Sequence, residues 1–229
     1  MGLSDAVRRH VLLDFDGPVC SLFAGAPAPD IARDLHDYLT KDGIEAPESW
    51  GTDDPLALLR AVADTHPALV EPADTRLTQL ETSAAGSAAP TPGGREFLDA
   101  CAATARPVWI VSNNSGAAIR TYLAAHGLTV AGVFGRVPGD PTSMKPSARL
   151  LADAMAAAES GPSECVFIGD AVRDVEAGKA AGVGTIGYAN KPHKDQKLRA
   201  AGAVAVTTSM TDLAQAVLDA GEWSHLWAQ

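Results

Sequence analysis

An apolar run near the start of the chain ends in two carboxylates one residue apart. The run Val-Leu-Leu-Asp-Phe covers residues 11–15, and Asp16 and Gly17 follow it. Such a run is typical of a buried parallel strand, and open α/β sheets bind ligands beyond the carboxyl ends of their strands. Side chains two positions apart share one face of a strand, so Asp14 and Asp16 can address one site. Carboxylates can bind a hard cation or act as nucleophiles.

Three further segments carry residue types suited to phosphoryl transfer. Residues 111–115 (Val-Ser-Asn-Asn-Ser) offer hydroxyl and backbone N–H groups at the expected start of a helix, where anions bind well. Lys145 precedes Pro146, which suits the first turn of a helix. Asp170 ends an apolar run, and Asp174 follows one helical turn later. Parallel strands bring these segments to the same edge of a sheet as Asp14.

Each segment alone also has an ordinary structural interpretation. Ser112 or Ser115 can cap a helix, Lys145 can be a solvated surface side chain, and the acids can close turns or cap helices. The combination favours phosphoryl transfer. Mg²⁺ typically takes one or two carboxylates together with substrate phosphate oxygens and water. A fixed lysine then neutralises the remaining charge on the phosphate.

Composition and charge exclude some classes of protein. The net charge of −10 argues against nucleic-acid binding, which relies on clustered Lys and Arg. The three cysteines, Cys20, Cys101 and Cys165, lie far apart without metal-binding spacing, as expected for reduced thiols in the cytoplasm. No apolar stretch reaches transmembrane length, so no membrane partner is expected. Acids soon interrupt the apolar run after Arg8 and Arg9, so we expect no signal peptide.

The segment 19–90 differs in composition from the rest of the chain. It contains twelve acids and four bases, so it carries −8 of the net charge of −10. Apolar residues at helical spacing predict helices over 30–41, 54–64 and about 69–80. The small, polar and Pro-bearing residues 82–92 suit a linker. We therefore expect domain boundaries that leave 19–90 as a separate helical unit.

From Gly93 onward, predicted helices and strands alternate, which indicates a doubly wound parallel sheet. We expect the strand near residues 11–15 to join this sheet, so that residues 1–18 and 91–229 form one α/β domain. The predicted strands cover 108–111, 133–134, 165–168, 185–188 and 203–206, and the predicted helices cover 94–104, 115–126, 146–159, a stretch from 172, 193–200 and 211–219.

The order and spacing of the four segments resemble the haloacid dehalogenase-like hydrolase superfamily, particularly its phosphoglycolate-phosphatase-like members. The resemblance covers the sheet domain almost throughout. It extends to residues 178–183 and 201–203, which look like the family's packing turns. It implies a Rossmann-like core, with 19–90 as a helical cap. The chain departs from the family pattern at Pro18, where a residue with a free amide is usual; we expect a stiffened entry to the cap with the chemistry intact.

The resemblance also implies a role for each site residue. Asp14 would be the nucleophile and Asp16 the general acid and base. Ser112 and the amide of Asn113 would hold the substrate phosphate. Lys145 would stabilise the pair of nucleophile and phosphate.

The same resemblance implies a Mg²⁺ site among four aspartates. Asp14 would be a ligand as well as the nucleophile, and the backbone carbonyl of Asp16 would be another. Asp170 would bind the metal directly, while Asp174 would support the metal or its waters. We therefore expect Mg²⁺ as the cofactor.

The expected activity is a Mg²⁺-dependent phosphatase that hydrolyses a small phosphorylated metabolite through an aspartyl-phosphate. A sugar phosphomutase or other phosphotransferase needs the same acids and stays open, as does a non-catalytic regulatory binding protein. Asp16 argues against a carbon–halogen hydrolase, which resembles the phosphatases but lacks this acid. Phosphonate-cleaving relatives use a cap lysine, and Lys41, the single lysine in 19–90, looks like ordinary charge at a helix end.

A cap over the strand ends would exclude water and limit the size of the substrate. We expect its hinges near residues 18–21 and 88–92, and Phe23 as an apolar wall of the pocket. A substrate bearing an acid would need positive charge, for which the cap offers Arg33, Lys41, Arg60 and Arg76; for each arginine, a solvated helix face is the alternative. The sequence leaves the oligomeric state open.

Overall fold

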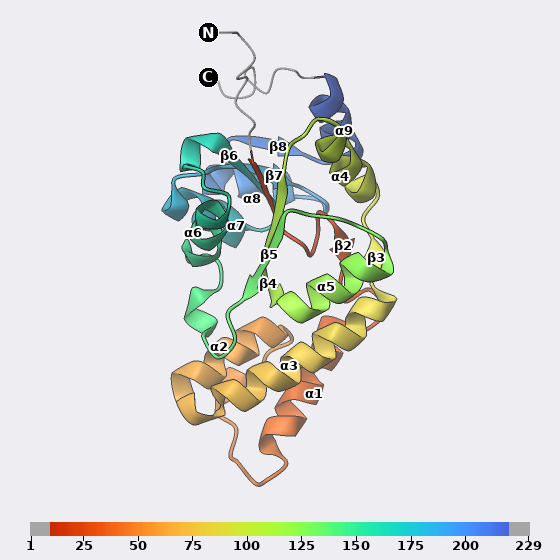
Figure 1. Ribbon diagram of the computed structural model, residues 1–229. Helices are drawn as coiled ribbons and strands as arrows, with labels where there is room; N and C mark the ends of the chain where they lie inside the picture. Colours follow the sequence, from red (N-terminus) through yellow and green to blue (C-terminus); the bar gives the residue numbers. More distant parts are fainter. Residues whose placement is uncertain (1–9, 220–229) are drawn as a thin grey trace.

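A parallel six-stranded sheet forms the centre of the computed structural model, which describes residues 10–219. The strand order is β5-β4-β1-β6-β7-β8 (Figure 1). β1 therefore lies in the middle of the sheet, although the helical segment separates it from β4 in sequence. The predicted doubly wound α/β fold is confirmed. The strands are β1 His10–Leu13, β4 Val108–Ser115, β5 Gly132–Arg136, β6 Cys165–Gly169, β7 Gly184–Tyr188 and β8 Ala205–Thr207.

Helices cover both faces of the sheet because its apolar side chains alternate between the faces. Val11 and Leu13 belong to the core with α4 (Gly94–Ala103), α5 (Gly116–Ala125) and α9 (Met210–Asp219). Leu12 belongs to the opposite core with α6 (Arg149–Ala157) and α7 (Val172–Ala181), and α8 (Lys194–Ala201) packs beside α7. This burial on both faces explains why the strands read as continuous apolar runs.

Three helices form a second layer of structure at the carboxyl ends of the strands (Figure 1). They are α1 (Ala28–Thr40), α2 (Pro55–Thr65) and α3 (Val70–Ala84), and we call them the helical unit. Their apolar faces share a core of their own around Leu35, Leu59 and Leu77, with Trp50 buried beside them. The predicted helices are thus present, each within a few residues of its expected bounds.

The two chain segments that join the helical unit to the sheet lie side by side. β2 (Cys20–Ser21) pairs antiparallel with β3 (Ala89–Pro90). The sequence predicts a plain linker over 82–92, but α3 continues to Ala84 and a 3₁₀ turn (Ala85–Ser87) precedes β3. The backbone pairing of the two segments gives order to residues whose small side chains suggested a linker.

A second difference from the predicted elements concerns the helix expected over 146–159. α6 begins at Arg149, so Pro146 is outside its first turn, and the Lys145–Pro146 peptide is cis. Met144 is buried in the core of the helical unit, and Lys145 is buried beside the sheet. These two tertiary contacts hold the chain out of helical geometry until it has passed Pro146.

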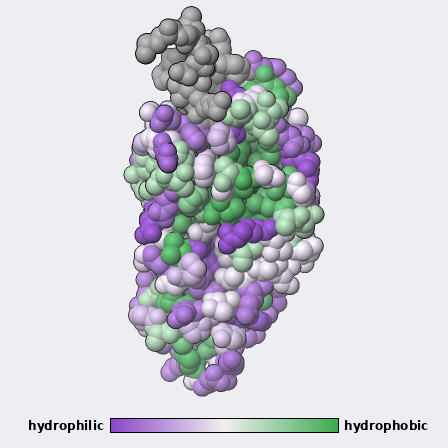
Figure 2. Space-filling model, viewed as in Figure 1, coloured by the Kyte–Doolittle hydropathy of each residue, from purple (hydrophilic) through white to green (hydrophobic). Residues whose placement is uncertain are grey.

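Apolar residues gather in the middle of the face shown in Figure 2, over the region of β4, β5 and α5. Between residues 10 and 219, no helix is both long and apolar enough to cross a membrane. The expected absence of a signal peptide rests on Arg8 and Arg9, which lie outside the described residues.

We expect the contact between α7 and β7 to depend on Gly178. A Cβ at this position would lie 2.0 Å from the Thr185 hydroxyl and 3.0 Å from the Val183 carbonyl oxygen. Overpacking of this kind should lower the free energy of unfolding of Gly178→Ala by about 1–3 kcal/mol, despite the better helix propensity of Ala. Urea denaturation measures the change. The matched control is Gly86→Ala, where a Cβ meets nothing within 4 Å. Equal stability of the two variants would contradict the close packing.

Candidate active site

Asp14 and Asp16 lie where β1 ends and the chain turns toward the helical unit. The Asp14 N–H donates to the Ile168 carbonyl at 2.9 Å, so β6 continues to hold the chain beyond the last residue of β1. Asp16 accepts a hydrogen bond from the Leu22 N–H at 2.9 Å. Burial raises the pKa of Asp16, which favours a carboxylic acid able to donate a proton.

Gly17 allows the β1 turn to approach β6 closely. Its φ is +109°, a conformation that favours glycine, and a Cβ would lie 2.6 Å from the Asp170 carboxyl carbon. A larger residue at position 17 would therefore push the acids at the ends of β1 and β6 apart. Pro18 follows in the same turn, two residues before β2, and its expected effect on the entry to the cap stays a prediction.

Lys145 is a fully buried cation shared by two carboxylates. Its Nζ lies 2.9 Å from Asp14 Oδ2 and 2.8 Å from Asp174 Oδ1, and it donates to the Val111 carbonyl at 3.0 Å. Burial alone lowers the pKa of Lys145, but the two carboxylates outweigh it and raise the pKa overall. The alternative of a solvated surface lysine is therefore wrong, since its side chain is 1% exposed.

Burial and neighbouring charges have opposing effects on the pKa of Asp14. Burial raises its pKa, Lys145 lowers it, and the nearby Asp174 and Asp170 raise it. The net result of these effects is a pKa of about 7. Burial and the neighbouring acids thus outweigh Lys145 and favour the protonated form of Asp14 more than in a free carboxyl group. A bound cation would restore the carboxylate form, because opposite charge lowers the pKa of an acid.

Three carboxylates could hold such a cation. Oxygens of Asp14, Asp170 and Asp174 lie within 4.8 Å of one another. An all-oxygen donor set of this kind fits Mg²⁺, so the residues present fit the expected cofactor. The side chain of Asp16 is outside this group, in keeping with the expectation that only its carbonyl would bind the metal. Asp170 also accepts hydrogen bonds from Asn190 at 3.0 Å and Lys194.

The carboxyl end of β4 brings Ser112 and Asn113 to the same place. Both are buried. The Asn113 side chain accepts from the Lys145 N–H at 2.7 Å and donates to the Lys145 carbonyl at 3.1 Å, which ties this strand end to the lysine. Ser115 accepts from the Ala118 N–H at 3.3 Å and caps α5, so the capping interpretation holds for Ser115.

A small cavity joins these residues. Its volume is about 180 Å³, and its lining includes Asp14, Asp16, Ser112, Asn113 and Lys145 from the sheet domain. The helical unit and the chain leading to it contribute Phe23, Asp54 and Leu56, so Phe23 lines the pocket as the sequence predicts. The arrangement can hold a small anion against a buried lysine, beside a carboxylate suited to nucleophilic attack.

Two charged residues that line the cavity, Arg173 and Asp54, were not predicted as site residues from the sequence. Arg173 lies between the two acids of its segment; burial lowers its pKa, but Asp174, Asp14 and other acids raise it overall. Its position one residue before Asp174 was a signal that could have identified it. Asp54 caps α2 by accepting from the Leu56 N–H at 2.9 Å, and the Asp-Pro pair at a helix start could have predicted that cap.

The four basic residues that segment 19–90 offers to a bound acid lie outside the cavity. Arg33 pairs with Asp30, Arg76 pairs with Asp34, and the Lys41 ammonium lies over the Tyr38 ring, as expected for solvated helix faces. Arg60 contacts the sheet domain by donating to the Lys145 carbonyl at 2.8 Å. None of these four described side chains lines the 180 Å³ cavity.

The three cysteines are buried and unpaired. Burial raises the pKa of the Cys20 thiol, and it raises that of Cys101 to about 12. A thiol that stays protonated is a poor nucleophile. Cys20, although close in sequence to Asp16, therefore packs as an apolar side chain.

Comparison with known proteins identifies the family. The family model for the haloacid dehalogenase-like hydrolase matches residues 9–182, which include all four segments described above. The chain belongs to this family. It is thus an enzyme of the hydrolase class, as predicted; the phosphoglycolate-phosphatase-like subgroup stays a prediction. A comparison with curated proteins finds no match.

Several solved structures share the fold of this one. A family hydrolase from Deinococcus radiodurans R1 with bound phosphate and sodium is 25% identical, with a TM-score of 0.60 over 95% of this chain and 98% of that one. CbbY from Rhodobacter sphaeroides in complex with phosphate is 15% identical, with a TM-score of 0.66 over 92% and 99%. A CbbY variant in complex with xylulose-(1,5)bisphosphate is 13% identical, with a TM-score of 0.65 over 89% and 95%. Family and phosphate-bound neighbours together support a phosphoric monoester hydrolase.

Proposed function

We propose that this haloacid dehalogenase-like hydrolase is a Mg²⁺-dependent phosphatase that acts on a small phosphorylated metabolite through an aspartyl-phosphate. The observation that carries the proposal is the buried Lys145–Asp14 pair at 2.9 Å, in a small cavity that Ser112 and Asn113 also line. A buried cation beside a nucleophilic carboxylate is the charge arrangement that a phosphoryl group needs.

Asp14 and Asp16 divide the chemistry between them. An oxygen of Asp14 attacks the phosphorus and forms an acyl-phosphate, while the ester bond to the leaving oxygen breaks. Asp16, whose pKa is raised by burial, donates its proton to that oxygen. Asp16 then takes a proton from a water molecule, which attacks the phosphorus and releases inorganic phosphate and free Asp14. The water supplies the hydroxyl group gained by the phosphate.

The surrounding residues hold the phosphoryl oxygens and the cofactor. Lys145, the Ser112 hydroxyl and the Asn113 amide would neutralise or bind the phosphoryl oxygens. Asp14, Asp170 and the Asp16 carbonyl would hold Mg²⁺, which supplies positive charge at the phosphoryl group when bound. Asp174, which belongs to the same group of carboxylates, would support the metal or its waters, and it also positions Lys145, which it contacts at 2.8 Å.

The helical unit would act as a cap that selects a small substrate. In this proposal residues 1–18 and 91–229 form the core domain and 19–90 form the cap domain. A cavity of about 180 Å³ has room for a phosphoryl group and a short organic portion. The phosphate-bound hydrolase from Deinococcus radiodurans and CbbY with xylulose-(1,5)bisphosphate support this class of ligand by likeness.

Substitution of the two acids should separate their roles. Asp14→Asn should abolish hydrolysis of para-nitrophenyl phosphate, because an amide cannot form the acyl-phosphate. Asp16→Ala should lower kcat by roughly 10²–10⁴-fold, the usual effect of removing a general acid and base. Steady-state kinetics measures both. The matched control is the exposed Asp42→Asn, which should keep normal rates. Normal turnover in Asp14→Asn would rule out the proposed nucleophile.

Removal of divalent metal should stop the reaction. We expect no hydrolysis in excess EDTA and full recovery when Mg²⁺ is restored, because the cation would supply positive charge beside Asp14 and at the phosphoryl group. Asp170→Asn should raise the Mg²⁺ concentration at half-maximal rate by about tenfold or more, since it loses a charged ligand. Calorimetric titration with Mg²⁺ measures the same change without turnover. Undiminished activity in EDTA would contradict the metal requirement.

A panel of phosphate esters tests the class of substrate. We expect the highest kcat/KM for a small phosphorylated metabolite, because the cavity is closed on one side by the helical unit. The panel should also contain a folded phosphoprotein and a 5′-phosphorylated oligonucleotide. A higher kcat/KM for either of these than for every small ester would overturn the proposed cap function.

A further inference from the structure

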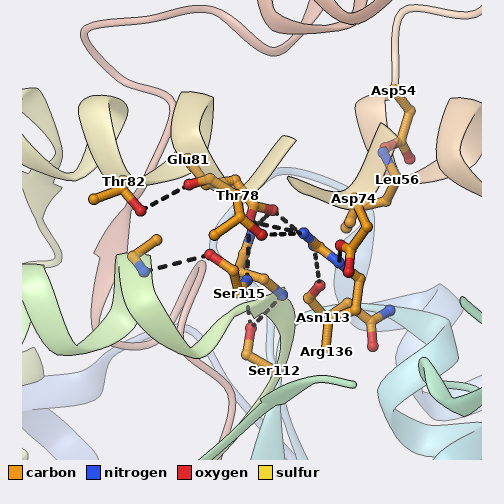
Figure 3. A network of polar contacts seen from close by, with 12 residues as sticks. Asp54, Leu56, Asp74, Thr78, Glu81, Thr82, Ser112, Asn113, Ser115 and Arg136 are labelled. Atoms are coloured by element: carbon orange, nitrogen blue, oxygen red, sulfur yellow. Dashed lines mark hydrogen bonds and ion pairs between the residues drawn. The ribbon is translucent and has the colours of Figure 1, made fainter. Parts of the chain in front are cut away.

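A buried ion-pair network joins helix α3 to the sheet domain (Figure 3). Asp74, Thr78 and Glu81 lie on one face of α3, at the i, i+4 and i+7 positions. All three meet Arg136 at the end of β5. Its guanidinium lies 2.5 Å from Asp74 Oδ1, 3.0 Å from Glu81 Oε1 and 3.3 Å from the Thr78 hydroxyl. The exposed fraction of the side chain is 1% for Arg136, 7% for Asp74 and 0% for Glu81.

Glu81 extends this network to residues 112–115, the segment that ends β4. Its Oε2 accepts from the Ser115 N–H at 2.9 Å, and its Oε1 accepts from the Asn114 side chain at 3.2 Å. Arg136 donates to the Asn113 carbonyl at 2.9 Å. Three successive residues of the segment are thus held by side chains of α3 and β5, and one of them, Asn114, also lines the cavity. Because Asn113 in turn bonds both backbone groups of Lys145, the contacts continue to the buried lysine.

The charge of the network bears directly on anion binding. Glu81 and Asp74 bring two buried carboxylates close to the N-terminus of α5, an end of a helix that attracts anions. Uncompensated negative charge there would oppose a bound phosphate. Burial lowers the pKa of Arg136, but Glu81 and Asp74 outweigh it and raise the pKa overall, so the guanidinium stays charged. Arg136 therefore balances one of the two negative charges that Asp74 and Glu81 place beside residues 112–115.

We propose that Glu81 and Arg136 are positioning residues for the phosphoryl subsite: Glu81 orients residues 113–115, and Arg136 offsets the negative charge that Glu81 and Asp74 bring with them. The inference rests on the proposed function, in which Ser112, Asn113 and Lys145 hold the phosphoryl group. It assigns to α3, in the proposed cap, a part in phosphate binding that requires no contact with the substrate.

The test compares variants that differ in the sign of the charge removed. Arg136→Met leaves two buried carboxylates without a cation, so the Kd for inorganic phosphate should rise by about tenfold or more. Asp74→Asn removes negative charge at nearly constant shape, so the Kd should stay the same or fall. Glu81→Ala removes the acceptor for the Ser115 N–H, so the Kd and the KM for para-nitrophenyl phosphate should both rise more than kcat falls.

Two further variants control for general disruption. Arg76→Met breaks the partly exposed ion pair between Arg76 of α3 and Asp34 of α1, and its phosphate Kd should stay within about twofold of the original value. Arg136→Lys keeps the charge but loses the planar fork, so it should recover part of the affinity lost in Arg136→Met. Calorimetry in Mg²⁺ gives the Kd values, and thermal unfolding shows whether each variant is folded.

The outcomes separate this inference from the proposed function. If the unaltered enzyme neither binds phosphate nor hydrolyses phosphate esters, the proposed function fails. If it does both, but Arg136→Met and Glu81→Ala keep its phosphate Kd, the positioning role is wrong. Should Arg136→Met fail to fold, Asp74→Asn and Glu81→Ala decide. A weaker phosphate affinity in Asp74→Asn, equal to that in Glu81→Ala, would overturn the charge argument.

Discussion

The structure depends on one buried cation that two carboxylates share. A lysine ammonium without solvent is stable only when oppositely charged groups surround it, and a buried carboxylate has the same requirement. Lys145 meets both requirements at once because it lies within 3 Å of Asp14 and Asp174. Removing the lysine would leave two buried carboxylates without the cation that they share. The end of β1, the first turn of α7 and the chain before α6 are therefore bound to one another by charge as well as by packing.

This requirement also shapes the connection between sheet and helical unit. The peptide of Lys145 accepts from Arg60 on α2, and Met144 packs into the core of the helical unit. On α3, Asp74 and Glu81 pair with Arg136 of β5. Two helices thus contact segments that also line or support the cavity. The β2–β3 pair adds a backbone connection between the two crossing segments. The helical unit is in this way attached at its helices as well as at its linkers.

The acids of residues 19–90 differ in whether they face solvent or a buried cation. Most acids of residues 19–90 face solvent, so the strongly negative composition of that segment says little about the cavity. Asp74 and Glu81 are exceptions, because both are buried against a cation of the sheet domain. A count of charges treats all of these acids alike. Their effect on a bound anion depends on which of them are neutralised by a neighbour and which are screened by water.

The chemistry-bearing segments and the parallel sheet were both predictable from the sequence. A strand buried on both faces must be a run of apolar residues, and the run has to end where the chain meets solvent or ligand. This is why Asp14, Asn113 and Asp170 could be assigned to strand ends from local pattern alone. The helices of 19–90 followed from apolar spacing in the same way. Local rules of this kind need only the residue and its near neighbours.

Tertiary structure decided the burial of Lys145, the partners of Asp174 and the network around Arg136. Residues 145 and 14 are far apart in sequence, as are 136 and 81, so neither pairing leaves a local signal. The late start of α6 has the same origin, because contacts of Met144 and Lys145 with other elements override the helix-starting preference of Pro146. The sequence by itself determined which residue types stand at the ends of which elements. Only the fold decided which charged side chains form ion pairs in the interior, because those pairs depend on distances between segments that no local pattern encodes.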